Sequence, residues 1–312
     1  MSKHITGENC KKINYLADDF IDFKDLLKQN KITESITTEK QSLGDVLITG
    51  ATGWLGSHIL DEFLSNEKGL AYCLIRGTDL QTSRKKLNNA LDYYFGDKYK
   101  TCDRIVVICG DITEKVILDK PIDTIIHSAA NVKHYGTYEQ FYKINVIGTK
   151  NMIALAKEKN AKLIHISTVS VSGSSFEQPD LPVTDYDESK LFIGQSLENV
   201  YSRSKFESEI EVLQAKLTGL EAAIIRVGNL TNRHTDMKFQ RNYQENATLT
   251  RLKAFIDLKQ FPREIENIEL NFSPANCTAR AIITLANHYN ENHSIYHAYN
   301  KSIHRYMRKI GV

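Results

Sequence analysis

The chain has 312 residues, of which 41% are hydrophobic and 25% are charged, and its formal net charge is +2. This length and composition suit a folded protein of one large or two smaller domains, and so small a charge excludes electrostatic attraction as a reason to expect a nucleic acid or an anionic membrane as partner. The chain shows no secretory signal, no apolar run of membrane-spanning length and no C-x-x-C among its five cysteines, so we expect a cytoplasmic protein with reduced thiols and no membrane contact.

Residues 1–43 are mostly polar and contain one amphipathic stretch. In YLADDFIDFKDLL the apolar residues recur at roughly helical spacing. We interpret 1–43 as a linker that carries a short amphipathic helix, with an apolar face suited to packing on the main body.

From residue 44 onward, predicted strands alternate with predicted helices. The strands are short, rich in Val, Ile and Leu, and apolar on both faces, which is typical of a parallel sheet covered on both sides. The alternation indicates an α/β fold with a Rossmann-type doubly wound sheet over 44–230. The strands are predicted at 45–49, 71–75, 104–108, 123–127, 162–167 and 221–227, and the helices at 54–66, 79–95, 138–159 and 201–217.

The pattern changes after residue 230. Two helical stretches follow, near 246–260 and 276–290, with FPREIENIELNFSP between them. We expect 231–312 to form a smaller, mostly helical lobe that binds the substrate.

Three glycines, Gly50, Gly53 and Gly56, connect the first strand of this region to its first helix. A helix N-terminus offers unpaired N–H groups and a partial positive charge, which bind phosphate. Glycine allows the tight turn and lets the backbone approach a pyrophosphate. A flexible loop with coincidental glycines is the alternative, but the strand–turn–helix context favours a dinucleotide site. Its predicted residues are Thr49, Gly50, Thr52, Gly53, Trp54, Leu55 and Gly56.

The residue that follows the second strand indicates which dinucleotide binds. An acidic residue about 20 positions after the glycine turn would bind the ribose 2′-hydroxyl of NAD. This chain has Arg76 there, and a guanidinium suits the 2′-phosphate of NADP. Arg84 and Lys85 add positive charge nearby. A solvated surface arginine is the alternative, and we favour NADPH over NADH.

Tyr201 and Lys205 form Y-x-x-x-K, which places them on one face of a predicted helix. A lysine beside a phenol lowers the phenol pKa, so the tyrosine can act as an acid or a base near neutral pH. Alone, the pair is equally consistent with an ordinary surface helix. The end of the fifth strand, HISTVSVSG, adds the hydroxyls of Ser167, Thr168 and Ser170.

Together these motifs resemble the extended short-chain dehydrogenase/reductase superfamily over about 44–300. Within it, the chain is similar to the thioester reductase domain that ends some nonribosomal peptide synthetases. Aminoadipate and carboxylic acid reductases belong to the same group. Fatty acyl-CoA reductases are more distant, because they usually carry S-T-A-[YF] where this chain has STVS. The segments that carry the resemblance are TGATGWLGSHIL, CLIRG, HSAANV, KINVIGT, ISTVSVSG, YSRSKFESE and IIRVGNLTNR.

The resemblance implies roles for particular residues. Thr168 would be the catalytic hydroxyl, with Ser167 and Ser170 as alternatives, and Tyr201 would supply the proton. Lys205 would bind the nicotinamide ribose, and Asn145 would support that lysine through water. Further cofactor contacts would come from the segments after the third, fourth and sixth strands, at Asp111, Ile112, Ser128, Ala129, Ala130, Val227 and Asn229.

The implied reaction is the NADPH-dependent release of an acyl or peptidyl thioester from the phosphopantetheine arm of a carrier protein, on another domain or chain. The product would be an aldehyde, with the alcohol as the product of a second reduction. Because chains of this group continue for some tens of residues beyond the match to YHAYN (296–300), we expect the 231–312 lobe to be incomplete. A sugar-nucleotide epimerase or dehydratase and a non-catalytic cofactor-binding scaffold are the alternatives.

Two features have no assigned chemistry. A long insert, 174–200, separates Thr168 from Tyr201, and we interpret it as a lid, a docking surface for the carrier, or a solvated loop. Three histidines near the strand ends are interpreted as packing or surface residues, because no other ligand lies at metal spacing and no metal site is predicted. They are His127, His134 and His165.

Overall fold

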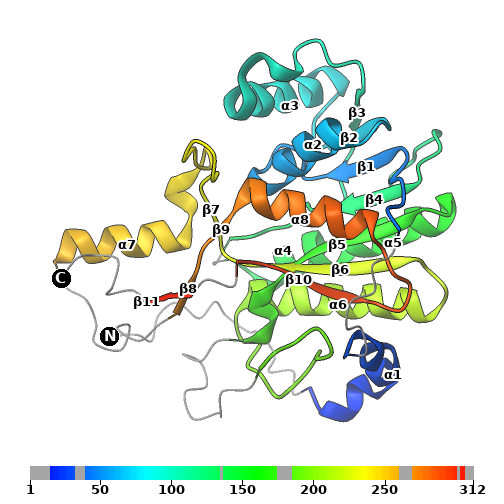
Figure 1. The fold of residues 1–312 in the computed structure, drawn as a ribbon, viewed down its shortest axis with the longest axis vertical. Helices are drawn as coiled ribbons and strands as arrows, with labels where there is room; N and C mark the ends of the chain where they lie inside the picture. Colours follow the sequence, from blue (N-terminus) through cyan, green and yellow to red (C-terminus); the bar gives the residue numbers. More distant parts are fainter. Residues whose placement is uncertain are drawn as a thin grey trace.

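Seven parallel strands form the central sheet of the protein, as its computed structural model shows (Figure 1). The structure describes residues 15–31, 39–133, 136–173, 185–259, 269–300 and 303–305. The strand order is β10-β6-β5-β4-β1-β2-β3, so the predicted Rossmann-type sheet is confirmed. The strands are β1 (Val46–Thr49), β2 (Ala71–Ile75), β3 (Ile105–Cys109), β4 (Thr124–His127), β5 (Lys162–Thr168), β6 (Ala222–Val227) and β10 (Ile295–Ala298).

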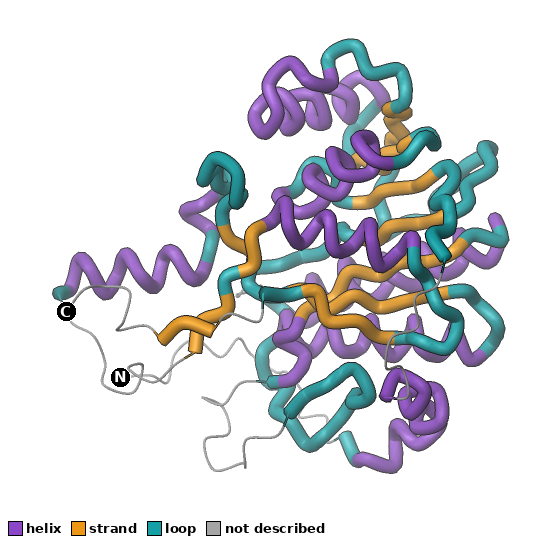
Figure 2. The backbone as a smooth tube through the Cα atoms, viewed as in Figure 1, coloured by secondary structure: helices purple, strands orange, loops and turns teal. Residues whose placement is uncertain are grey.

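Helices cover both faces of the sheet (Figure 2). On β1, Val46 and Ile48 pack into one buried cluster and Leu47 packs into another on the opposite face. This explains why the strands are apolar at every position instead of alternating. The first cluster lies under α2 (Trp54–Asn66), α3 (Leu80–Phe95) and α8 (Ala275–Asn287), and the second under α5 (Gly148–Lys159) and α6 (Val200–Leu217).

Two elements from the stretch expected to form the C-terminal lobe belong to the sheet and its helical layer. In α8, Ile282 and Ile283 share a buried cluster with Phe63 of α2. β10 extends the sheet by pairing in parallel with β6, with Ile295 opposite Ile224. The sequence analysis predicted the helix but not this seventh strand, because IYHA is not a Val-, Ile- and Leu-rich run like those that marked the other strands.

The remaining part of that stretch lies beside the sheet. α7 (Ala247–Leu258) extends away from the body, as Figure 1 shows. Short strands pair near it: β7 (Leu230–Thr231) with β9 (Ser273–Pro274), and β8 (Glu269–Asn271) with β11 (Ile303–Arg305). The smaller turns are η3 (Gly96–Tyr99), η5 (Val169–Ser172) and η6 (Tyr243–Glu245).

The helix predicted at 138–159 contains a change in hydrogen-bonding pattern. It begins as α4 (Tyr138–Phe141), passes through a π-helical turn, η4 (Tyr142–Ile147), and continues as α5. A π-helical turn inserts an extra residue and shifts the side chains that follow around the helix axis, and such turns frequently occur at functional sites.

The amphipathic stretch near the N-terminus is helical and packs on the main body. It comprises η1 (Ala17–Phe23), α1 (Lys24–Lys28) and η2 (Gln29–Lys31). The rings of Tyr15 and Phe20 each lie 5.5 Å from that of Phe206 on α6. Within the described ranges, no helix combines the length and apolar character needed to cross a membrane.

Candidate active site

Most predicted site residues gather at one edge of the sheet. Parallel strands all end at the same edge, so segments that are far apart in sequence meet there. The edge includes the glycine turn after β1, Arg76 after β2, Gly110–Ile112 after β3, Ser128–Ala130 after β4, Thr168 at the end of β5, and Val227 and Asn229 at the end of β6.

The glycine turn is tightly packed. Gly50 has a φ of +78°, and a Cβ there would lie 2.8 Å from the backbone nitrogen of Ala129. A Cβ on Gly56 would overlap the carbonyl oxygen of Gly50. Gly53 caps α2, and its N–H donates to Gly50 O at 2.8 Å. These contacts exclude a loose loop. The turn at the start of α2 also offers N–H groups without helical partners, and such groups can bind a pyrophosphate.

The side chains of two residues in the turn contact neighbouring elements of the fold. Thr49 Oγ1 accepts a hydrogen bond from Ala129 N at 3.1 Å and lies 2.8 Å from His127 Nδ1, so it joins β1 to the turn after β4. Trp54 donates from Nε1 to Thr231 O at 3.0 Å, and its ring centroid lies 5.2 Å from that of Tyr94. The Trp54 indole is therefore buried against α3 and β7, whereas its backbone belongs to the turn.

The residues predicted to contact the adenosine end are open to solvent. Arg76 and Arg84 are exposed, and among the described residues no carboxylate lies within ion-pair distance of either guanidinium. Asp111 is half-buried and accepts a hydrogen bond from Thr113 N at 2.9 Å. Two exposed arginines that form no ion pair with any described residue can therefore accommodate an extra phosphate.

Thr168 and Tyr201 meet although the insert separates them in sequence. Asn199 caps α6 by accepting hydrogen bonds from the backbone N–H groups of Tyr201 and Ser202, which places Tyr201 in the first turn. Burial raises the pKa of Tyr201 to about 12, while a hydrogen bond with the Thr168 hydroxyl lowers it. The phenol is therefore protonated at neutral pH and shares a hydrogen bond with Thr168.

The neighbouring hydroxyl of Ser167 is committed elsewhere. It is buried and donates to Glu209 Oε1 at 2.6 Å. The same carboxylate pairs with Arg226, with Arg226 Nη2 2.7 Å from Glu209 Oε2 and both side chains fully buried. Ser167 therefore belongs to an ion-pair network that joins β5, β6 and α6, and Thr168 is the hydroxyl that contacts Tyr201.

Lys205 belongs to α6, and its side chain contacts β5. Its Nζ donates to Ile166 O at 2.8 Å and to His165 Nε2 at 3.1 Å. Burial lowers the pKa of Lys205 to about 8, and the Glu209 carboxylate acts against this shift. Burial dominates the pKa of Tyr201, and the Thr168 hydrogen bond acts against it. The effect of Lys205 on that pKa stays a prediction.

Asn145 lies in the π-helical turn and is fully buried. Its Nδ2 donates to Asn131 O at 3.1 Å and to Ser204 Oγ at 2.8 Å, and its Oδ1 accepts from Asn131 N at 2.7 Å. Both amide hydrogens are thus used, and the side chain ties the turn after β4 to α6. Its backbone carbonyl also accepts from Thr149 and Ser208.

His127 and His165 form a buried pair on adjacent strands, with ring centroids 5.4 Å apart. Burial lowers the pKa of His127 to about 3, with the Lys205 charge acting in the same direction. The pKa of His165 is also well below 6.5 for the same two reasons, so both rings are neutral. The interpretation of His165 as a packing residue missed its contact with Lys205, and His134 lies outside the described residues.

The second half of the insert is packed on the sheet, whereas 174–184 lies outside the described residues. The Arg226 guanidinium lies 4.7 Å from the ring centre of Tyr186 and donates to Lys190 O at 3.2 Å. Gln195 Nε2 donates to Val171 O and Leu191 O, both at 3.0 Å. Residues 185–199 are therefore anchored beside the candidate site and do not form a solvated loop.

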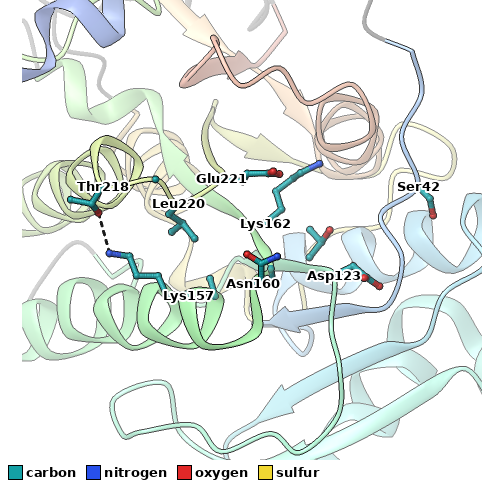
Figure 3. A pocket seen from close by; sticks show the side chains of 12 residues that line it. Ser42, Asp123, Lys157, Asn160, Lys162, Thr218, Leu220 and Glu221 are labelled. Carbon is teal, nitrogen blue, oxygen red and sulfur yellow. Dashed lines mark hydrogen bonds between the residues drawn. The ribbon is translucent and has the colours of Figure 1, made fainter.

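A polar hollow of about 440 Å³ lies at the opposite edge of the sheet (Figure 3). Asp123, Lys162 and Glu221 line it, and Lys157 Nζ donates to Thr218 Oγ1 at 3.1 Å. None of the predicted site residues lines this hollow, and the candidate site stays at the carboxyl edge. In the described part of the chain, no three His, Cys, Asp or Glu side chains are grouped to hold a metal ion.

Comparison with known proteins identifies the family. Residues 48–282, more than half of the chain, match the nicotinamide dinucleotide-binding family described as Male sterility protein. The chain belongs to this family. Its structure is similar to that of a thiolation-reductase di-domain from an archaeal nonribosomal peptide synthetase, with a TM-score of 0.83 and 37% identity over 95% of this chain and 79% of that one.

Two further relatives agree. The reductase domain of the aureusimine biosynthetic cluster has a TM-score of 0.83 and 30% identity, covering 94% of this chain and 78% of that one. A linear gramicidin synthase protein from Brevibacillus parabrevis is 29% identical over 227 residues, which are 68% of this chain and 4% of that protein. The predicted similarity to reductase domains of peptide synthetases is thus confirmed, and the chain spans a small part of this curated relative.

Proposed function

We propose that this protein is an NADPH-dependent thioester reductase. It releases an acyl or peptidyl chain, as an aldehyde, from the phosphopantetheine arm of a carrier protein. The observation that carries the proposal is the hydrogen bond between Thr168 and Tyr201, beside the buried Lys205, at the edge where the glycine turn fits a dinucleotide. The similarity to a thiolation-reductase di-domain supports the choice of a thioester as substrate.

The side chains at the edge provide the proton and stabilise charge. Bound NADPH supplies the hydride to the thioester carbonyl carbon. The Thr168 and Tyr201 hydroxyls donate hydrogen bonds to the carbonyl oxygen as it becomes negative. Tyr201, protonated because burial raises its pKa to about 12, then transfers its proton to that oxygen. The resulting hemithioacetal loses the thiol and leaves the aldehyde, and a second round would yield the alcohol.

Other residues hold the cofactor. The N–H groups of Trp54, Leu55 and Gly56 at the start of α2 would bind the pyrophosphate. The remaining N–H of Lys205 would bind the nicotinamide ribose, and Arg76 and Arg84 the 2′-phosphate. Asp111 and Ile112 would lie along the adenine side, and Ser128, Ala129, Ala130, Val227 and Asn229 along the rest of the cofactor.

The direct test mixes the purified chain with NADPH and an acyl-pantetheine thioester. We expect NADPH absorbance to fall as free thiol appears, with an aldehyde among the products. An acyl group loaded on a carrier protein should react faster than the free pantetheine thioester, because the carrier would add binding contacts. Turnover of other carbonyl compounds with no release of thiol from any thioester would contradict the proposal.

The choice of NADPH over NADH depends on Arg76. Because a hydrogen bond to a charged group contributes about 1.5–3 kcal/mol, we expect Arg76→Ala to weaken NADPH binding by about 10- to 100-fold. The affinity for NADH should change little. Titration of both cofactors by calorimetry measures the two constants. Lys68→Ala removes an exposed charge before the opposite end of β2 and is the matched control. An equal loss for both cofactors would contradict a contact to the 2′-phosphate.

A further inference from the structure

Lys205 uses two of its three N–H groups on a single strand. Its Nζ donates to Ile166 O at 2.8 Å and to His165 Nε2 at 3.1 Å, and the lysine is 3% exposed. An ammonium has three hydrogens, so one has no partner among the described residues. β5 therefore holds the lysine in one orientation and leaves a single N–H for a ligand.

The state of His165 follows from this contact. A lysine ammonium can only donate, so Nε2 must be the accepting nitrogen and the ring proton lies on Nδ1. That Nδ1 is buried and has no hydrogen-bond partner in the described part of the protein. An unpaired buried donor lowers stability, and an apolar side chain of similar size would avoid it. Packing alone therefore does not account for a histidine at this position.

Among the described residues, Asn145 makes no direct hydrogen bond to Lys205, and its predicted support through water stays a prediction. Its side chain bonds to Asn131 and Ser204, and both of its amide hydrogens are already used. We propose that His165 is a positioning residue for Lys205: its Nε2 holds the ammonium beside β5 so that the third N–H is available to the nicotinamide ribose. This inference rests on the proposed function only in assigning the ribose as ligand, because the contact between the two side chains is independent of it.

The charged and titratable groups around the pair come from three elements. Glu209 lies one turn after Lys205 on α6, with Tyr201 one turn before it, and Arg226 on β6 pairs with Glu209. His127 on β4 lies beside His165, 5.4 Å between ring centroids. Glu209 favours the charged lysine, whereas burial disfavours it. Because one carboxylate is shared with an arginine, the neutral acceptor on His165 contributes directly to keeping Lys205 protonated.

The test measures the ionisation of Lys205 by NMR, from the pH dependence of its side-chain signals. In His165→Leu we expect the Lys205 pKa to fall by about one unit, because the charged form loses one hydrogen bond. His165→Gln retains an acceptor and should restore most of the shift. His165→Met, which fills the space without an acceptor, repeats the test if the leucine variant does not fold. A Lys205 titration in the leucine or methionine variant that matches the parent protein would overturn the proposal.

Activity and stability separate positioning from packing. We expect the alkaline limb of kcat/KM in His165→Leu to move down by the same unit, about tenfold at a fixed pH above it. The melting temperature should change little, because losing the bond to Lys205 and losing the unpaired Nδ1 donor have opposite effects on stability. Thr124→Val removes a buried hydrogen bond to Leu43 O at the other end of β4 and is the control. It should lower the melting temperature and leave the Lys205 titration unchanged. If the parent chain reduces no thioester, the proposed function fails, whereas the NMR titration still decides the role of His165.

Discussion

Tyr201→Phe is expected to lower kcat for thioester reduction by about 10²- to 10⁴-fold, the range that general-acid catalysis contributes. The variant keeps the ring that packs at the start of α6 but lacks the proton and the hydroxyl that bonds to Thr168. NADPH affinity should stay within about threefold of the parent value, because the glycine turn and Arg76 are unchanged. Pre-steady-state absorbance at saturating NADPH measures the chemical step.

The control for this variant is Tyr93→Phe. Tyr93 is 39% exposed on α3, so this variant also removes a tyrosine hydroxyl, but at a position away from the site. We expect parent activity from it. Tyr201→Phe with more than about a tenth of the parent kcat would contradict the assignment of the acid.

The parent activity should fall as the pH rises through about 8, because burial lowers the Lys205 pKa to that value and the lysine then loses its charge.

Glu209→Ala is expected to lower the free energy of unfolding by about 3–5 kcal/mol, because it leaves a fully buried arginine without its partner. The carboxylate contacts Arg226 through both oxygens, at 3.0 Å and 3.2 Å from Nε and 2.7 Å from Nη2. It also accepts from Ser167. Denaturant unfolding followed by far-UV circular dichroism measures the loss. Glu209→Leu combined with Arg226→Met should recover most of it, since neither charge then remains buried.

Glu211→Ala is the matched control, two residues further along α6. Its ion pair with Lys150 has a similar distance of 3.0 Å, but the two side chains are 32% and 43% exposed. Such surface pairs contribute about 0–1 kcal/mol. If both glutamate variants lost the same stability, the buried network would have no special role in holding β5, β6 and α6 together.

We also expect Glu209→Ala to loosen residues 185–199, because Arg226 contacts Tyr186 and Lys190.

The sequence analysis identified the elements whose signals are local. Six of the sheet's strands were predicted because each is a short apolar run, and the glycine turn because Gly50, Gly53 and Gly56 can be read within one segment. The spacing of Tyr201 and Lys205 was equally local, since four residues form one helical turn. Parallel strands end at one edge by topology, so the general position of the site followed from the fold class.

Other features depended on residues that are distant in sequence. Nothing near Ile295 marks a seventh strand, because β10 is defined by its pairing with β6. In the π-helical turn, the carbonyl of Asn145 accepts from the Ser208 hydroxyl, which comes from α6 and cannot be read from KINVIGT. Whether residues 185–199 were a solvated loop or an anchored segment was decided by Arg226, which comes from a different strand.

The sequence by itself determined that Tyr201 and Lys205 share one helix face and that a glycine turn follows β1. Only the tertiary structure decided what those side chains contact and how they ionise. Packing α6 on β5 buries Lys205 beside His165 and Ile166, and brings Tyr201 to Thr168. Burial then raises the pKa of Tyr201 and lowers that of Lys205, because loss of solvent disfavours the charged form of each group. Loss of solvent depends on the surrounding elements, and a motif within one helix cannot specify it.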